Sequence, residues 1–353
     1  MPQGSTTSEE NSSQHPVSLR SPRLCGLFSG QCETMQTKEK IRITAVQEPP
    51  VFLDLAQSVA KACRLIAQAA QEGAQLIVFP ETWLPGYPIW LDVAPGAGLW
   101  DYEPATAVFR RLFQNSVEME SAAVTRLQQA ARAARAVVVM GLNERDGGTL
   151  YNSILYIGAD GQILGKHRKL TPTYTERLVW GVGDGSTLTV VDTPLGRLGG
   201  LICWEHWMPL TRHAMHAQQE LIHVAQWPTV KEMLLIASRH YAFEGRCFVV
   251  AAGTVLQKRD LAHLDLALLA DIPGDDDTFL MRGGSAIISP EGDLLAGPLY
   301  EQPGLVSAEI DPQQAVDGRL TLDVVGHYGR PDIFQLHVNT TPQKHVHWQD
   351  FRL

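Results

Sequence analysis

The sequence predicts a layered α/β domain built around a mixed β-sheet. From residue 41 onward, segments with strand periodicity alternate with segments of helical periodicity. The middle of the chain is rich in hairpins, which join neighbouring strands in antiparallel pairs. Neither an internal repeat nor an internal linker interrupts this order. Helix–strand alternation combined with hairpins indicates a mixed sheet rather than a purely parallel one.

The first part of the domain is predicted to run strand, helix, strand, helix, strand. Residues 41–46 alternate in the manner of a half-buried strand. Asp54 can cap the first helix and Gly73 can end it, since apolar residues repeat at helical spacing between them. The next buried strand, the second long helix and the strand after it are expected at 74–79, 118–135 and 137–141.

The remainder is predicted to hold three hairpins and two helix–strand pairs. Gly and Pro mark the hairpin turns. The hairpins join 151–157 to 162–169, join 187–191 to 198–203, and turn for the last time at 290–293. The helices are expected near 209–218 and 231–245, followed by strands at 221–225 and 247–252. The acidic, glycine-containing stretch 271–277 indicates an exposed loop insertion.

The composition is that of a soluble globular protein and disfavours several function classes. The chain has 353 residues, of which 44% are hydrophobic and 19% charged. A formal net charge of −9 disfavours a sequence-independent grip on nucleic acid or on an anionic membrane. No apolar run reaches the roughly 18 residues of a transmembrane helix. The five cysteines are odd in number and form no CxxC pair, so we expect a reducing cytoplasm and no disulfide framework.

Residues 1–39 differ from the rest of the chain. They begin with a polar stretch that has no periodicity, which predicts a disordered N-terminal extension. The apolar stretch 24–28 is too short for the core of a secretory signal and is broken by Gly26. Because Met35 lies just before the first strand, we expect residues 1–34 to be either an upstream extension or the product of a start assigned too early.

Three residues with catalytic potential each follow a predicted strand. They are Glu81, Lys169 and Cys203. Sheet-based folds collect their sites at the carboxyl ends of strands, so the three side chains could converge. Taken singly, each has a simpler interpretation: a helix cap for the Glu, a solvated basic face for the Lys, and a small buried hydrophobe for the Cys.

The sequence around these residues favours the catalytic interpretation. The three motifs are Phe79-Pro80-Glu81-Thr82-Trp83-Leu84-Pro85-Gly86-Tyr87-Pro88, His167-Arg168-Lys169-Leu170-Thr171-Pro172-Thr173-Tyr174-Thr175-Glu176-Arg177 and Cys203-Trp204-Glu205-His206. In order and in local context they resemble the nitrilase branch of the carbon–nitrogen hydrolase superfamily. The similarity extends from about residue 41 to about residue 338.

The resemblance implies a cysteine-dependent hydrolysis of a nitrile to the carboxylic acid and ammonia. Cys203 would be the nucleophile, because a thiolate can add to a nitrile carbon and split one slow reaction into two easier steps. Glu81 would be the base, and Lys169 would stabilise the developing charge together with a backbone N–H after Cys203. The intermediates would be a covalent thioimidate and then a thioester. No step needs a metal or an organic cofactor.

Two further residues near these motifs are open to more than one interpretation. In the family a second Glu helps to position the Lys and the substrate, and Glu176 matches its place; the alternative is a surface partner for Arg177 or Arg168. A His close to a Cys suggests a Cys–His dyad. Neighbouring residues on an extended chain point to opposite faces, so His206 is expected nearer the pocket rim than the proton relay.

The residues after Cys203 bear on the choice of substrate. In the family, Cys203-Trp204-Glu205 separates nitrile hydrolysis from amide hydrolysis. We expect the substrate-binding residues to be Tyr87, Trp204, Glu205, His206, Trp207 and Trp227. Any of the tryptophans could equally be a core residue. The sequence leaves an arylacetonitrile and a medium aliphatic nitrile equally open.

The resemblance also implies a fold and an assembly. The fold would be a four-layer α-β-β-α sandwich over residues 40–328, and relatives form dimers or larger spiral homo-oligomers. Residues 329–353 resemble the C-terminal tails that reach across such interfaces. Alternatives are an amidase or nitrile-hydrating enzyme that uses the same site, a non-catalytic filament-forming scaffold, and a redox or metal-binding Cys protein.

Overall fold

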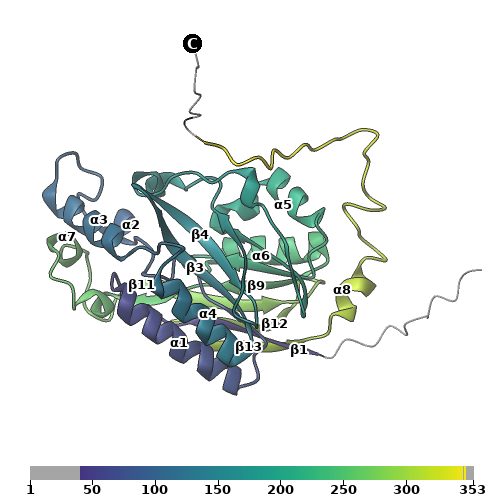
Figure 1. Ribbon diagram of the computed structural model, residues 1–353, viewed down its shortest axis with the longest axis horizontal. Helices are drawn as coiled ribbons and strands as arrows, with labels where there is room; N and C mark the ends of the chain where they lie inside the picture. The colour runs from purple at the N-terminus through teal and green to yellow at the C-terminus, as the bar shows by residue number, and fades with distance from the viewer. Residues whose placement is uncertain (1–39, 345, 347–353) are drawn as a thin grey trace, which may run out of the picture. The chain divides into compact units, whose positions relative to one another are not determined.

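The fold consists of two β-sheets packed face to face between two layers of helices. We describe it from a computed structural model covering residues 40–344 and residue 346. In Figure 1, helices α1 and α4 lie on one side of the strands and helices α5 and α6 on the other. The bounds are α1 (Leu55–Gln71), α4 (Ala122–Ala134), α5 (Pro209–His216) and α6 (Glu232–Gly245). The expected four-layer α-β-β-α sandwich is therefore confirmed.

The first sheet has six strands in the order β13-β1-β2-β3-β4-β5. Strands β1, β2 and β3 are parallel, whereas the β13–β1, β3–β4 and β4–β5 pairs are antiparallel, so the sheet is mixed as predicted. The strands are β1 (Ile41–Gln47), β2 (Leu76–Val78), β3 (Val137–Asp146), β4 (Thr149–Ile157), β5 (Ile163–Arg168) and β13 (Gly304–Ile310).

The second sheet has seven strands in the order β10-β11-β9-β8-β7-β6, with β12 paired to β11. It is also mixed, because β7, β8 and β9 are parallel and the other pairs are antiparallel. Its strands are β6 (Val191–Thr193), β7 (Gly196–Ile202), β8 (Ile222–Gln226), β9 (Phe248–Ala252), β10 (Val255–Gln257), β11 (Phe279–Ile288) and β12 (Leu294–Tyr300).

Strand periodicity divides the apolar residues between two cores. In β3, Val139 packs in the core between the two sheets, while Val138 points the opposite way into the core beneath α1 and α4. The helices contribute amphipathic faces to this outer core. Asp54 caps the N-terminus of helix α1, because its carboxylate accepts a hydrogen bond from the backbone N–H of Gln57. The chain leaves the helix through Gly73, which is in the left-handed conformation.

Several predicted element limits were wrong. The helix expected at 118–135 begins only at Ala122, and a separate helix, α3 (Glu103–Asn115), precedes it. The first strand of the hairpin expected at 187–191 lies later in the chain: a 3₁₀ turn, η2 (Gly185–Thr187), precedes the short strand β6, which pairs with β7 as the predicted hairpin. The other short elements are α2 (Trp90–Val93), η1 (Tyr174–Leu178), η3 (Cys203–Trp207), η4 (Lys258–Leu261), α7 (Ala267–Ala270) and α8 (Gln313–Gly318).

Loops and the C-terminal segment complete the description. Residues 271–277 contain no helix or strand and are exposed except for Ile272, as predicted for a loop insertion. The described part of the C-terminal segment, 329–344, also lacks helix and strand, and the Gln343 backbone N–H donates to the Asp184 carboxylate of the same chain. The predicted disordered extension, 1–39, lies outside the described residues.

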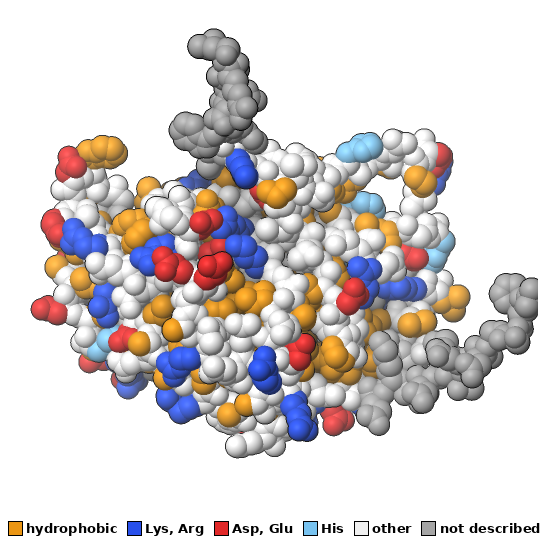
Figure 2. All heavy atoms as spheres, viewed as in Figure 1, with side chains coloured by type: hydrophobic (Ala, Val, Ile, Leu, Met, Phe, Trp, Pro, Cys, Tyr) orange, Lys and Arg blue, Asp and Glu red, His pale blue; other side chains and the backbone are white. Residues whose placement is uncertain are grey.

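The surface and the helices bear on the expected absence of membrane and nucleic-acid partners. Among the described residues, no helix is both long enough and apolar enough to cross a membrane. On the face in Figure 2, the described Lys and Arg side chains are scattered among Asp and Glu rather than gathered in one continuous positive patch.

Candidate active site

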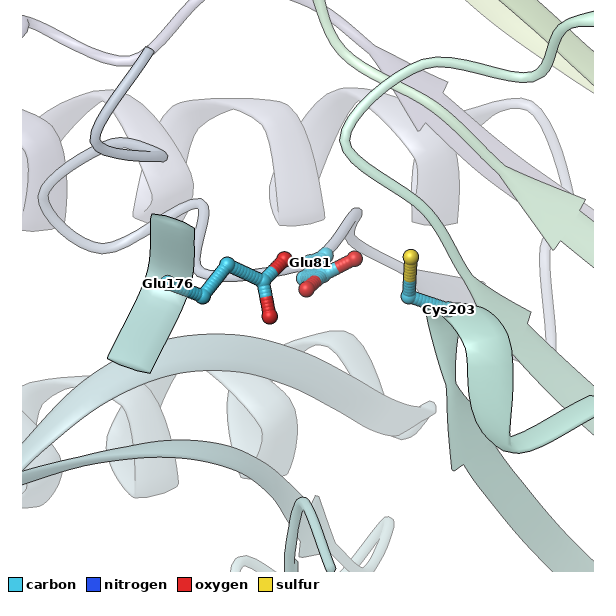
Figure 3. A group of neighbouring side chains, drawn as sticks. All are labelled: Glu81, Glu176 and Cys203. Atoms are coloured by element: carbon cyan, nitrogen blue, oxygen red, sulfur yellow. The ribbon is translucent and has the colours of Figure 1, made fainter. Parts of the chain in front are cut away.

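The ends of three strands bring a carboxylate, an ammonium and a thiol together. Glu81 follows β2, Lys169 directly follows β5, and Cys203 directly follows β7, so the two sheets both contribute to the site. A fourth side chain, Glu176, enters from η1. Figure 3 shows the Glu81 carboxylate between the Glu176 carboxylate and the Cys203 sulfur. All four residues are buried, with exposed fractions from 0% to 5%.

Lys169 lies at the centre of this cluster. Its Nζ donates to Oε1 of Glu81 at 3.0 Å and to Oε2 of Glu176 at 2.6 Å. Burial opposes the charge on Lys169, but the surrounding Cys203, Glu81 and Glu176 outweigh burial and raise its pKa above its ordinary value. The site therefore contains a permanent, water-excluded positive charge.

The two oxygens of Glu81 have different environments. Oε1 accepts hydrogen bonds from Lys169 and, at 2.7 Å, from Nδ2 of Asn152. Oε2 is buried and has no hydrogen-bond partner among the described residues. Burial raises the pKa of Glu81 to about 7, and Lys169 only partly offsets this. A carboxylate with one fixed oxygen, one free oxygen and a pKa near neutrality can both accept and return a proton.

Glu176 belongs to the cluster rather than to the surface. Its Oε1 accepts from the Tyr87 hydroxyl at 3.0 Å, and its Oε2 accepts from the Thr173 backbone N–H at 2.7 Å. The alternative of a surface partner is excluded by geometry, because Arg177 donates to the Pro172 carbonyl and Arg168 to Glu144 and Asp146. The contact between Glu176 and Lys169 holds η1 against the end of β5.

Cys203 has an unusual backbone conformation. Its φ is +54°, in the left-handed region that costs a non-glycine residue about 1–2 kcal/mol. This conformation marks an abrupt change from β7 to η3. Burial raises the pKa of the Cys203 thiol well above its usual range, against the opposing effects of Lys169 and a hydrogen bond from the Trp204 backbone N–H. The resting thiol is therefore neutral and needs a base before it can act as a nucleophile.

Glu205 links the two sheets through its carboxylate. Its carboxylate accepts from the backbone N–H groups of Ile202 at 2.6 Å and Leu170 at 2.7 Å, and from Nε2 of His167 at 3.0 Å. These partners lie at the ends of β7 and β5, so one buried carboxylate connects the strand that precedes Cys203 with the strand that precedes Lys169. The residue also borders the cavity, so its substrate-binding role stays a prediction, although its oxygens are already occupied by these hydrogen bonds.

His206 and Trp227 also differ from their expected places. His206 is 1% exposed and Trp227 is 0% exposed, and neither is among the described residues that line the cavity. The rim position predicted for His206 was wrong because it assumed an extended chain after Cys203, whereas η3 turns His206 back beneath Cys203, where Nδ1 bonds the Cys203 carbonyl at 2.7 Å. The Trp227 indole N–H donates to Ser238 inside the core.

The remaining predicted pocket residues do line a cavity above the cluster. Its volume is about 1260 Å³, and Tyr87, Trp204 and Trp207 lie in its wall together with Cys203 and Glu176. Trp204 is 56% exposed and Trp207 is 39% exposed, so both lie near its opening. The sequence did not indicate several other lining residues: Thr171, Pro172, Thr173, Tyr174, Met233 and Met281. Of these residues, only Thr171–Tyr174 could have been identified from the sequence, because they lie beside Lys169 in the same motif.

The cluster resembles a metal site in composition but not in charge. Glu81, Glu176 and Cys203 have potential ligand atoms within 4.8 Å of one another. The Lys169 ammonium, however, hydrogen-bonds both carboxylates and so supplies the positive charge that a metal ion would bring. The donor set therefore fits nucleophilic catalysis with a fixed cation.

The fold and this site define a hydrolase class, and sequence comparison identifies the family. The chain matches the carbon–nitrogen hydrolase family model over residues 42–319. It is 40% identical over 308 residues to Nitrilase 1 of Arabidopsis thaliana, which spans 87% of this chain and 89% of that protein. It is also 40% identical over 308 residues to a bifunctional nitrilase/nitrile hydratase of Lupinus angustifolius, over 87% and 88% of the two chains. The chain belongs to the carbon–nitrogen hydrolase family, which confirms the resemblance.

Solved structures agree on the fold. A carbon–nitrogen hydrolase from Helicobacter pylori superimposes with a TM-score of 0.62 and 20% identity, over 80% of this chain and 92% of that chain. Saccharomyces cerevisiae Nit3 gives a TM-score of 0.62 with 18% identity, over 82% and 96%. An amidase from Nesterenkonia sp. gives 0.56 with 19% identity, over 78% and 92%.

Proposed function

We propose that this chain is a nitrilase, which hydrolyses an organic nitrile with two waters to the carboxylic acid and ammonia. Its similarity to Nitrilase 1 over most of both chains supports this reaction. The observation that carries the mechanism is the free oxygen of Glu81: Oε2 is buried without a partner beside Cys203, while Oε1 is fixed by Lys169. An oxygen of this carboxylate lies within 4.8 Å of the Cys203 sulfur, so we infer that Glu81 takes the proton from the thiol.

The first half of the reaction forms a covalent thioimidate. Glu81 takes the proton of the Cys203 thiol, and the sulfur adds to the nitrile carbon as one π bond of the C≡N group breaks. The electron pair moves to nitrogen, which receives the proton from Glu81. Lys169 and the Trp204 backbone N–H stabilise the negative charge that develops during this addition.

The second half removes nitrogen and releases the acid. Glu81 deprotonates a water, which adds to the thioimidate carbon to give a tetrahedral intermediate. Glu81 returns this proton to the nitrogen, and the proton of the new hydroxyl group then also passes to the nitrogen through Glu81. The C–N bond breaks, ammonia leaves, and the C=O of a thioester forms. A second water cleaves the C–S bond, which releases the carboxylic acid and regenerates the free thiol.

The name of one relative points to a second product, the amide. The tetrahedral intermediate can also lose the Cys203 sulfur, and this cleavage releases an amide. The relative from Lupinus angustifolius is named a bifunctional nitrilase/nitrile hydratase, so amide release is the alternative activity that we propose to measure here. The position of the proton decides the outcome, because the group that is protonated leaves more readily.

The proposed substrates carry a bulky apolar substituent. Tyr87, Trp204 and Trp207 would contact that substituent, because their rings lie in the cavity wall above Cys203. Aryl, arylacetonitrile and medium aliphatic nitriles all suit a cavity of about 1260 Å³.

The test is release of ammonia, with product identification, from a panel of these nitriles and their amides. Wild-type protein and Cys203→Ala are compared side by side. We expect ammonia and acid from nitriles with the wild type and none with the variant. Release from amides alone would move the chain to amidase activity. Turnover that survives in Cys203→Ala would overturn the mechanism.

We further propose that the catalytic domain spans residues 40–328 and acts in a cytoplasmic homo-oligomer. Free thiols at Cys63, Cys203 and Cys247 suit a reducing compartment. Helices α5 and α6 expose apolar side chains that suit a protein interface: Leu210, Ile236 and Phe243. The tail 329–353 would add to this interface. Light scattering on the full chain and on a chain ending at 328 tests this; a monomeric full chain would refute it.

A further inference from the structure

Four buried polar side chains form a continuous hydrogen-bonded row behind the nucleophile. The Tyr241 hydroxyl donates to Oε2 of Glu220 at 2.6 Å, and Oε1 of Glu220 lies 2.8 Å from Nδ1 of His223. Nε2 of His223 lies 3.0 Å from Nε2 of His206, and Nδ1 of His206 lies 2.7 Å from the Cys203 carbonyl oxygen. The row runs from α6 through β8 to η3, and each side chain is at most 2% exposed.

The chemistry of the last acceptor fixes the protons along the row. A backbone carbonyl can only accept, so Nδ1 of His206 carries a proton. Burial lowers the pKa of His206 to about 3, and therefore the ring is neutral and its Nε2 is an acceptor. Nε2 of His223 must then be the donor between the two rings.

The same reasoning assigns a proton to Glu220. Burial lowers the pKa of His223 well below its ordinary value, so this ring is neutral and its Nδ1 accepts. Oε1 of Glu220 must then donate, which means that the carboxyl is protonated. Burial raises the pKa of Glu220 to about 7, in agreement with this assignment. The Glu220–His223 contact is therefore a neutral hydrogen bond, although its length would also suit an ion pair.

We propose that His206, His223, Glu220 and Tyr241 are positioning residues that fix the Cys203 carbonyl through hydrogen bonds of a single direction. The inference rests on Cys203 being the nucleophile of the proposed reaction. Since Cys203 has a φ of +54°, the orientation of its peptide groups determines where the thiol points. A donor aimed at the Cys203 carbonyl holds that orientation against relaxation.

Packing around the row indicates a built arrangement. The His206 ring lies against Trp227 with centroids 4.8 Å apart, and the His223 ring stacks on Tyr241 at 3.7 Å, so neither imidazole can rotate freely. Gly199 in β7 leaves the space that the Glu220 carboxyl occupies, because a Cβ at that position would overlap Oε1 of Glu220. The glycine four residues before Cys203 therefore makes room for the Glu220 carboxyl.

The first test separates the two nitrogens of His206. In His206→Asn the amide nitrogen matches Nδ1 and can still donate to the Cys203 carbonyl, whereas in His206→Gln it matches Nε2 and cannot. With a nitrile that the wild type hydrolyses, we expect His206→Asn to keep kcat within about threefold and His206→Gln to lose about tenfold or more, with KM little changed in both. Equal loss in both variants, or wild-type kcat in His206→Gln, would overturn the proposal.

The second test examines the direction of the hydrogen bonds. Glu220→Gln keeps a donor for His223 and an acceptor for Tyr241, as the protonated acid does, whereas Glu220→Leu keeps neither. We expect Glu220→Gln to retain kcat within about threefold and Glu220→Leu to lose about tenfold. If Glu220→Gln were as impaired as Glu220→Leu, the assigned direction would be wrong.

A readout that is independent of nitrile turnover separates this inference from the proposed function. The rate at which iodoacetamide alkylates Cys203, followed by mass spectrometry of the Cys203 peptide, reports the position of the thiol directly. We expect the alkylation rates to rank the folded variants in the same order as kcat. If the wild type hydrolysed no nitrile, the proposed function would fail, yet the alkylation rates would still decide this inference. A uniform alkylation rate across folded variants would refute it.

Discussion

The Lys169 ammonium lies 3.0 Å from Oε1 of Glu81, while Oε2 of the same carboxylate has no partner among the described residues. One oxygen is thus fixed and the other is free. This asymmetry lets a single carboxylate remain oriented while it exchanges a proton with the thiol and with water. Because Lys169 contacts Oε1, a substitution that removes the base but keeps this acceptor separates the proton transfer from the ion pair.

We expect Glu81→Gln to reduce kcat for nitriles by about 10²–10⁴-fold, the usual contribution of a general base. Gln has the same shape as Glu and can still accept from Lys169, but it cannot remove the thiol proton. Steady-state ammonia release measures the effect. Glu118→Gln is the control, because Glu118 is exposed and its partner among the described residues is Arg145. Comparable activity in Glu81→Gln and wild type would remove Glu81 from the proton transfers.

The acid limb of the pH profile should reflect Glu81. Burial raises its pKa to about 7, and the base must be ionised to act, so kcat/KM should fall as the pH falls through about 7. Below that point the decrease should approach about tenfold per pH unit, as for loss of one proton-accepting group. Initial rates between pH 5 and pH 9 test this. A midpoint near the ordinary carboxyl value of 4.5 would contradict the buried environment.

Lys169→Met should destabilise the fold by about 3–5 kcal/mol, because it leaves buried Glu81 and Glu176 without their shared cation. Urea unfolding measures the loss. The double variant Lys169→Met, Glu176→Gln should regain part of it, since one uncompensated charge is removed.

Lys166→Met is the matched control for this loss. Lys166 is partly exposed, and its partner Glu144 keeps a second cation in Arg168, so we expect a loss of about 1 kcal/mol or less. Equal losses for the two lysines would show that the buried cluster does not depend on the charge of Lys169.

Features that depend on local sequence periodicity could be predicted from the sequence, whereas features that depend on contacts between distant residues could not. Strand β1 and helix α1 could be predicted because each repeats apolar residues at its own period over its whole length. Helix α3 was missed because only two of its residues, Val108 and Leu112, are buried, which leaves a thin pattern. The motifs predicted which chemical groups meet, since each motif stands at a strand end.

The surroundings of Cys203 could not be predicted in the same way. A positive φ at a non-glycine residue leaves no local pattern in the sequence. The 3₁₀ turn that follows reverses the direction expected for His206. The partners of His206 and Glu205, which are His223 and His167, lie on other strands. Tertiary contacts of this kind become visible only when both sheets are in place.

The pH dependence of stability provides the last prediction, through Glu220. Burial raises its folded pKa to about 7, from an ordinary 4.5, against opposing effects of His216, Tyr241 and Arg197. Between these values the folded state holds a proton that the unfolded state has released, so this stabilisation is complete below about 4.5 and is lost as the pH rises through 7. At about 1.4 kcal/mol per pH unit, the wild type should lose up to about 3 kcal/mol relative to Glu220→Gln, which cannot ionise. Urea unfolding at pH 5, 6, 7 and 8 should therefore give a difference that grows in favour of Glu220→Gln.

Glu244→Gln serves as a control of opposite sign. At Glu244 the effect of burial is outweighed by hydrogen bonds from His216 and Arg212, which lower its pKa to about 2. This variant should therefore be less stable than the wild type throughout the range. A wild-type-to-Glu220→Gln difference that stayed constant from pH 5 to pH 8 would mean that Glu220 does not hold its proton in the folded protein.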